Sequence, residues 1–158
     1  MPDVAYRGIK DDLVNGAVDW NAGTAVFRML LLEVRSTTGG ADEDKDLQFL
    51  SALLGVTGVA EFTGTNYARQ TLANPTTTYD AATDRYLLDA NDVVFANLGV
   101  ADGTDGTVRA AVVYRRVGAD DSTPGDDPLY CLLDVNDTVT NGQNFTVALN
   151  SAGLLALA

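Results

Sequence analysis

Carboxylates are the side chains of this sequence with the most obvious capacity for chemistry. The chain carries 22 acidic residues against 10 basic ones, and only three of the acids are Glu. Several Asp residues fall in turn-like clusters and offer hard oxygen ligands of the kind Ca²⁺ prefers: Asp102, Asp105, Asp120, Asp121, Asp126 and Asp127. The segment ADGTDG nevertheless lacks the spacing and the terminal Glu of an EF-hand loop, and Asp-Gly commonly turns a hairpin. We therefore interpret these clusters as turns and predict no metal site.

Carboxylates could also act in pairs, as in glycoside hydrolysis, where one acid sits in an apolar pocket beside the sugar. The only tryptophan, Trp20, lies in the polar segment VDWN, which does not indicate a sugar cleft. There is no His and one Cys, so Ser–His and Cys–His catalysis and Cys/His zinc sites are excluded in their ordinary forms. Cys131 lies in the apolar run LYCLL and is predicted to be a core residue. We predict no catalytic residue and no cofactor, and keep an Asp-based hydrolase as an alternative.

The stretch GTNYARQTL, residues 64–72, brings an aromatic and a cation to the start of a predicted strand. It is compatible with a ligand clamp or with a purely structural turn. We favour the structural turn, built on Gly64. In it, Tyr67 packs its ring against the sheet, while Arg69 pairs with an acid or makes a cation–π contact.

Charge restricts the partners. The net charge of −12 would repel phosphate backbones, so no nucleic-acid partner is expected. The apolar runs, such as residues 29–32, are far too short to span a bilayer, and the N-terminal residues lack a signal-peptide core. We expect no membrane partner and a soluble protein made in the cytoplasm.

The elements that must position these residues are mostly strands. The length of 158 residues and the 46% apolar content predict one domain, residues 1–158, with a real core. A helix is predicted over 5–14, ending at Asn15-Gly16, and a second over 43–54, capped by Asp42 and ended by Gly55. Strands are predicted over 24–34, 69–72, 85–89, 93–98, 108–116, 129–135, 145–149 and 154–157. The fold class is mainly β, an antiparallel β-sandwich or barrel-like domain with one or two short α-helices.

The order of these segments resembles a family of small virion proteins of tailed bacteriophages, described as head decoration or minor capsid proteins. The resemblance covers roughly residues 8–158. It is carried by IKDDLVNGAVDW, AVFRMLLLEV, DKDLQFLSALLGV, GTNYARQTL, LLDANDVVFANL, AAVVYRR, PLYCLLDV and VTNGQNFTVALNSAGLLAL.

The resemblance implies a non-enzymatic structural protein on the outer capsid surface of the virion, synthesised in the host bacterial cytoplasm. Its partner would be the major capsid protein, and it would self-associate, for instance as a trimer on a capsid symmetry axis. A tail component or tail-tip adhesin that binds host glycans is the alternative. Acidity suits an external position, because an internal protein would face packaged DNA.

Residues 1–10 are the predicted capsid contact. They combine apolar Val4, Tyr6 and Ile9 with the cations Arg7 and Lys10 in an otherwise acidic chain. We expect a flexible arm that orders on the capsid surface.

Overall fold

The computed structural model describes residues 4–21, 23–36, 40–149 and 154–157. Its helical elements are α1 (Arg7–Val14), the 3-10 turn η1 (Ala41–Glu43) and α2 (Leu50–Leu54). Its strands are β1 (Val4–Ala5), β2 (Val26–Val34), β3 (Ala60–Glu61), β4 (Gln70–Thr71), β5 (Thr76–Asp80), β6 (Arg85–Asp89), β7 (Val93–Leu98), β8 (Thr107–Arg116), β9 (Leu129–Val139), β10 (Gln143–Val147) and β11 (Leu155–Leu157). The mainly β, antiparallel, sandwich-like architecture predicted from the sequence is confirmed.

The largest sheet has the order β1-β9-β8-β2-β3, with β4 pairing beside β3 on the outer side of β2. All of its pairings are antiparallel, and β2 runs beside β8 from Val26 opposite Arg116 to Leu32 opposite Ala110. Its long strands are rich in Val, Leu and aromatic residues, which suit a pleated and buried surface. We call it the central sheet.

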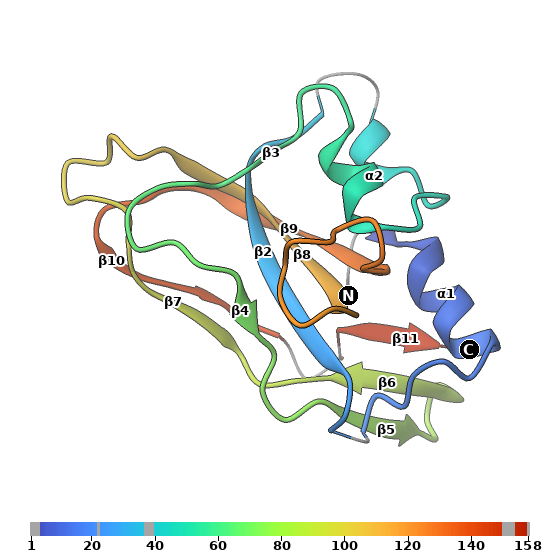
Figure 1. Ribbon diagram of the computed structural model, residues 1–158. Helices are drawn as coiled ribbons and strands as arrows, with labels where there is room; N and C mark the ends of the chain where they lie inside the picture. The colour runs from blue at the N-terminus through green and yellow to red at the C-terminus, as the bar shows by residue number, and fades with distance from the viewer. Residues whose placement is uncertain (1–3, 22, 37–39, 150–153, 158) are drawn as a thin grey trace.

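A second layer faces one side of the central sheet. It consists of a two-stranded sheet, β10-β7, and a three-stranded sheet, β11-β6-β5. Figure 1 shows β7 and β10 on the left of the long strands, β5, β6 and β11 below them, and α2 on the opposite side.

The central sheet is buried on both faces. Along β2, Met29 and Leu31 belong to the apolar cluster that faces the second layer, while Leu30 and Leu32 belong to the cluster that faces α2. Successive residues of a strand point to opposite faces, so a continuous apolar run is what such a doubly covered strand requires. Leu30, Leu31 and Leu32 are accordingly all 0% exposed.

The helix predicted over 43–54 is mostly wrong. Only η1 and the five residues of α2 are helical, and Gly55 ends α2 as expected. The chain between them is extended at Phe49, which forms an isolated bridge with Pro128. Gln48 accepts a hydrogen bond from the Leu129 N–H at 2.9 Å. Pairing with Pro128 and Leu129, at the start of β9, therefore replaces the helical hydrogen bonds of this stretch.

Asp42 does not act as a helix cap. Its carboxylate is buried and receives a hydrogen bond from Arg35 Nε at 2.9 Å. A buried carboxylate strongly favours a charged partner, so this pairing takes the side chain away from the role predicted for it.

The flexible arm predicted at the N-terminus is also wrong where the structure describes it; residues 1–3 lie outside the described part. Val4 and Ala5 form β1 and pair with Leu132 and Cys131 of β9. Tyr6, 0% exposed, and Ile9, 2% exposed, are core residues. The apolar residues of this segment are explained by packing in the fold, because Val4 and Tyr6 belong to the cluster that faces α2 and Ile9 belongs to the cluster that faces the second layer.

The other predicted elements are close to those observed. The helix over 5–14 corresponds to α1, with Asn15 as its C-cap and Gly16 at φ +61°. Strands β6 and β7 have the predicted bounds, and β9 runs four residues further, to Val139. Strand β5, with sequence TTTYD, was not predicted.

No helix within the described ranges is long and apolar enough to cross a membrane.

Candidate interaction surface and the ion-pair clusters around it

The turn at GTNYARQTL is shaped by close packing at Gly64 and by a left-handed Asn66. A Cβ on Gly64 would lie 2.5 Å from the Phe62 ring, so only glycine fits there without a shift. Asn66 has φ +60°, a conformation that Asn tolerates better than most residues. The Asp105 carboxylate accepts the N–H of Thr65 at 2.7 Å and ties this turn to the turn before β8.

The turn delivers Tyr67 and Arg69 to Glu61 of β3. Tyr67 Oη donates to Glu61 Oε1 at 2.7 Å, and Arg69 Nε and Nη2 donate to the two Glu61 oxygens at 2.8 and 2.6 Å. The Tyr67 ring packs edge-on against Phe62 and stacks on Phe95 at 6.1 Å between centroids. Burial, reinforced by the Glu61 charge, raises the pKa of Tyr67. The expected ring packing and acid pairing are therefore both present.

Arg69 also reaches the long loop between β8 and β9. Its guanidinium lies 5.5 Å from the Tyr114 ring centroid, the geometry of a cation–π contact, and Nη1 donates to Tyr114 Oη at 3.3 Å. Tyr114 Oη in turn donates to Asp121 Oδ1 at 2.7 Å, and Arg28 lies 3.3 Å from Asp121. The hydrogen bond to Glu61 raises the pKa of Arg69. These side chains form the edge cluster, which binds β3, β4 and the 117–128 loop to β2.

A second cluster fixes α1 to the central sheet. Arg115 donates through Nε and Nη2 to the two Asp12 oxygens at 2.7 and 2.9 Å, and Tyr130 Oη donates to Asp12 at 2.7 Å. Asp12 is only 8% exposed in this pair. The hydrogen bond to Asp12 raises the pKa of Arg115. Arginine pairs with a carboxylate at two points in this way when geometry must be fixed.

The third cluster joins η1 to the strands. Arg35 donates to Asp42 and to Asp134 at 2.9 and 3.0 Å, and it also pairs with Glu43. Tyr6 donates its hydroxyl to the Asp42 carbonyl. In all three clusters the carboxylates are held by arginines within the fold, which suits a structural role better than proton transfer.

The Asp-rich turns use their carboxylates locally. Asp102 accepts the Thr104 N–H at 3.1 Å, and Asp120 accepts the Ser122 N–H at 2.9 Å, as in Asx turns. Asp127 is buried and accepts the Val117 N–H at 2.8 Å. Burial, followed by the nearby Asp121 charge, raises the pKa of Asp127.

Trp20 and Cys131 are both in the core. Trp20 packs on Phe27, with ring centroids 4.1 Å apart, and donates its indole N–H to the Asp89 carbonyl at 2.9 Å. It is 3% exposed and cannot line an open sugar cleft. Burial raises the pKa of the Cys131 thiol to about 12, which suppresses its reactivity.

Of the five residues predicted to bind a capsid, the structure leaves two at the surface. Arg7 and Lys10 are exposed on α1, and Arg7 pairs with Asp11 at 3.0 Å. Val4, Tyr6 and Ile9 are buried and would reach a partner only if the segment unfolded locally. The five residues therefore do not form one contact surface.

A different surface stands out by its lack of charge. The outward-facing side chains of β7 and β10, together with exposed residues of β4 and just after β4 and β10, carry no charge: Thr71, Ala73, Val94, Ala96, Asn144, Thr146 and Ala148. We call them the uncharged surface. Residues 93–101 and 138–158 contain no charged residue at all in a chain of net charge −12.

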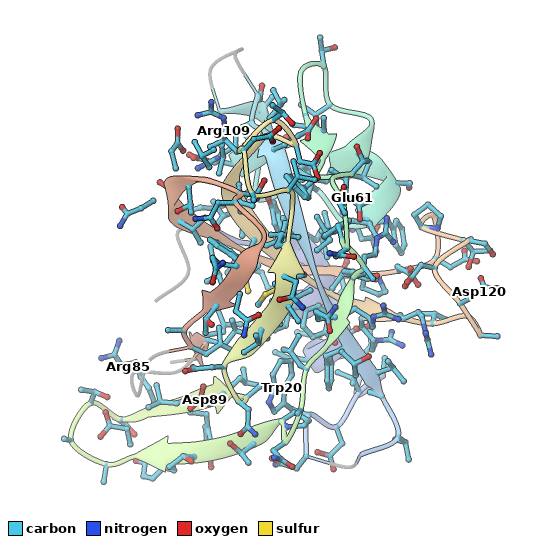
Figure 2. The ribbon with its side chains drawn as sticks, turned by 90° about the vertical axis from the view of Figure 1, so that its left-hand side faces the viewer. Trp20, Glu61, Arg85, Asp89, Arg109 and Asp120 are labelled. Atoms are coloured by element: carbon cyan, nitrogen blue, oxygen red, sulfur yellow. The ribbon has the colours of Figure 1, made fainter. Side chains whose placement is uncertain are left out.

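The uncharged surface follows from regular alternation in the two strands. Val93 and Phe95 of β7 and Val147 of β10 point into the core, so Val94 and its register partner Thr146 point outward. Val94 is 45% exposed. Figure 2 looks onto this side, with β7 between β10 and β4, while the labelled charges Arg109, Asp120 and Arg85 lie around its border.

A shallow groove of about 190 Å³ borders the uncharged surface. Its lining is uncharged as well: Leu98, Thr138, Val139, Thr140, Asn141, Gln143, Asn144 and Phe145. Depletion of charge, with some apolar and aromatic content, is typical of the centre of protein–protein contacts.

Sequence reasoning missed this surface, although a signal for it was present. In β7 and β10, core residues alternate with outward ones within charge-free runs, which indicates one buried face and one outward neutral face.

Comparison of the chain with protein-family models, with curated proteins and with solved structures finds no match in any of the three.

Proposed function

We propose that this protein is a non-enzymatic structural protein of a bacteriophage virion that binds the outside of the head and reinforces the capsid shell. The observation that carries the proposal is the uncharged surface on a strongly acidic domain. An acidic exterior repels DNA and other acidic surfaces, whereas a neutral strand face can be desolvated against a protein at little electrostatic cost. The order of segments, which resembles head decoration proteins, supports the same function.

In this proposal the major capsid protein contacts the uncharged surface. Reinforcement arises by mass action, because separating capsid subunits would also require breaking the contacts that the bound protein makes with them. The three ion-pair clusters support this role indirectly, since they fix α1, η1 and the 117–128 loop to the central sheet, on which β7 and β10 pack. Self-association on the capsid belongs to the same proposal.

The test is add-back to expanded heads that lack the protein. We expect such heads to assemble, to be less resistant to heat, and to regain resistance when the purified protein is added. Val94→Glu, which puts a charge on the uncharged surface, should weaken head binding by about tenfold or more. Val14→Glu is the matched control, because Val14 is 87% exposed at the end of α1, away from the surface. Equal loss with both variants, or heads that are fully robust without the protein, would contradict the proposal.

A tail component or tail-tip adhesin that binds host glycans is the second candidate, favoured by the groove. Its Thr, Asn and Gln side chains, beside Phe145, offer the mixture of hydrogen-bonding and apolar contacts that a neutral sugar could use. Counting copies per virion by mass spectrometry separates the two functions. A decoration protein is present in many copies, and a tail-tip protein in a few.

A further inference from the structure

Strand β10 has an edge that the described part of the fold does not cover. It pairs with β7 and, within the described ranges, with no other strand. It is five residues long, QNFTV, with no charge and no proline. Natural sheets usually protect such edges with charges, proline or covering segments, because an open edge pairs readily with another chain.

Among the residues that the structure describes, the other sheet edges are short or protected. Strands β1, β3 and β4 have two residues each and β11 has three, and β3 carries Glu61. The far side of β7 is bordered by the 65–73 segment, because the Gly99 N–H donates to the Thr65 carbonyl at 2.8 Å and the Asn91 N–H to the Ala73 carbonyl at 2.9 Å. Strand β5 is as long as β10, but the Asn21 side chain accepts the Thr77 N–H at 2.7 Å. The contrast singles out the part of β10 from Phe145 onward, which lies beyond the register shift between Gln143 and Phe145; a bulge of that kind protects an edge only where it occurs.

Side-chain contacts show which backbone groups of β10 point outward. The Leu149 N–H reaches the Asp92 carboxylate, next to β7, at 2.8 Å, and the Asn97 N–H of β7 reaches Asn144 Oδ1 at 3.1 Å. Because backbone groups alternate in direction along an antiparallel strand, residues 145, 147 and 149 turn their N–H groups toward β7. Thr146 and Ala148 therefore direct theirs away from β7, at the open edge.

We infer that the open edge of β10 pairs antiparallel with β10 of a second copy of this chain. The charge distribution favours this occupant: two copies of a chain of net charge −12 repel one another, and the repulsion is weakest where the charge-free residues 138–149 of both meet. Pairing would join β7-β10 of each copy into one four-stranded sheet, and two strands alone are a marginal sheet.

An antiparallel pairing of one strand with its own copy is two-fold symmetric and closed. The expected assembly is therefore a dimer. This differs from the trimer expected from capsid symmetry, and it does not depend on capsid binding through the outward-facing side chains.

The test uses the full chain in solution, followed by sedimentation equilibrium from micromolar to near-millimolar concentration. Thr146→Glu and Thr146→Lys each place like charges close together across the two-fold axis, and each should raise the dimer dissociation constant by about tenfold or more. A mixture of the two should restore dimers, because the opposed charges then attract. Thr78→Glu and Thr78→Lys, at an exposed position of β5, are the controls and should leave association unchanged.

Thr146→Pro adds a second test that does not involve charge. It removes the outward N–H while the ladder with β7 keeps its donors, so the dimer should be lost while the thermal midpoint changes little. A wild-type monomer at every concentration, a trimer, or a Glu and Lys mixture that stays monomeric would overturn the inference. A chain that is monomeric in solution yet protects β10 amides from hydrogen exchange on heads would identify the capsid protein as the occupant of this edge instead. The dimer is measured without capsids, so its failure leaves the proposed function standing, and failure of head binding leaves the dimer standing.

Discussion

In the central sheet, β2 has neighbours on both sides and cover on both faces, whereas β10, in the part of the chain that the structure describes, has one neighbour and an exposed outer face. The first region is held by apolar clusters and by three sets of buried or half-buried ion pairs. The second has neutral side chains outside and core side chains only beneath. The difference suggests a division of labour, in which one region supplies stability and the other is free to contact partners.

The largest effect is expected from the α1 cluster. Asp12→Ala leaves the Arg115 guanidinium and the Tyr130 hydroxyl without their acceptor, and breaking a buried pair in this way costs about 3–5 kcal/mol. Urea denaturation of the variant measures the loss. Arg7→Ala, which removes an exposed ion pair on the same helix, is the control and should cost less than about 0.5 kcal/mol. Similar losses in both would mean that α1 is not fixed through Asp12.

The contact of α2 with the central sheet gives the next effect. Leu50 is fully buried in the cluster that includes Leu30 and Leu32. Leu50→Ala should reduce the free energy of unfolding by about 2–5 kcal/mol. Leu54→Ala, at a half-buried position of the same helix, should cost less. A loss below about half a kcal/mol for Leu50→Ala would show that α2 is not docked.

Asp127 provides a pH-dependent comparison. Its pKa is raised in the folded protein, mainly by burial, so folding favours the protonated form and becomes less favourable as pH rises through that value. Asp127→Asn cannot ionise. It should therefore be more stable than the wild type by about 0.5–1 kcal/mol at pH 7. The gap should close as pH falls below about 4, where the wild-type carboxyl is protonated in both states. Unfolding curves at pH 7 and below about pH 4 measure the difference in stability between the two proteins. A difference that widens in acid would contradict the raised pKa of Asp127.

On the uncharged surface, substitutions should barely change stability. Val94→Glu alters an outward position of β7 and should move the free energy of unfolding by no more than about 0.5 kcal/mol. A thermal melt of the variant under conditions where the wild type is monomeric measures this shift. A loss of several kcal/mol would mean that the second region also supplies stability.

Calcium should have the smallest effect of all. The Asp102 and Asp120 carboxylates accept backbone N–H groups of their own turns. Millimolar calcium should therefore leave the thermal midpoint almost unchanged, whereas a site of micromolar affinity would raise stability by about 4 kcal/mol. A large calcium-dependent shift in calorimetry would restore the metal-binding alternative.

The sequence predicted those elements whose local pattern and tertiary environment agree. Strand β2 has an apolar run and is buried on both faces, and β6 and β7 are bounded by turns at the predicted residues. The prediction of a helix over 43–54 failed because the long-range pairing of Phe49 and Gln48 with the start of β9 has no signature in local propensity. Strand β5 was missed because its threonines form a strand only against β6.

For the candidate site, too, the sequence identified residues by their type but not the partners that the fold brings to them. Tyr67 and Arg69 were singled out by type and spacing, but the identity of Glu61 as their partner depends on the fold. The apolar residues Val4, Tyr6 and Ile9 were predicted to form a capsid-binding arm, because a sequence does not distinguish contacts within a chain from contacts between chains. Prediction of the uncharged surface requires both the charge-free runs, which the sequence shows, and the pairing of β7 with β10, which only the fold shows.

The pairing of Asp12 with Arg115 also affects how this protein is made. The two residues are 103 positions apart. At a synthesis rate of about 5–20 residues per second, Asp12 is therefore synthesised roughly 5–20 seconds before its arginine partner exists. The interval between the synthesis of β1 and that of its partner β9 is longer still. The central sheet thus cannot be completed from the first synthesised half, and the nascent chain must keep its early apolar residues from aggregating until β8 and β9 emerge.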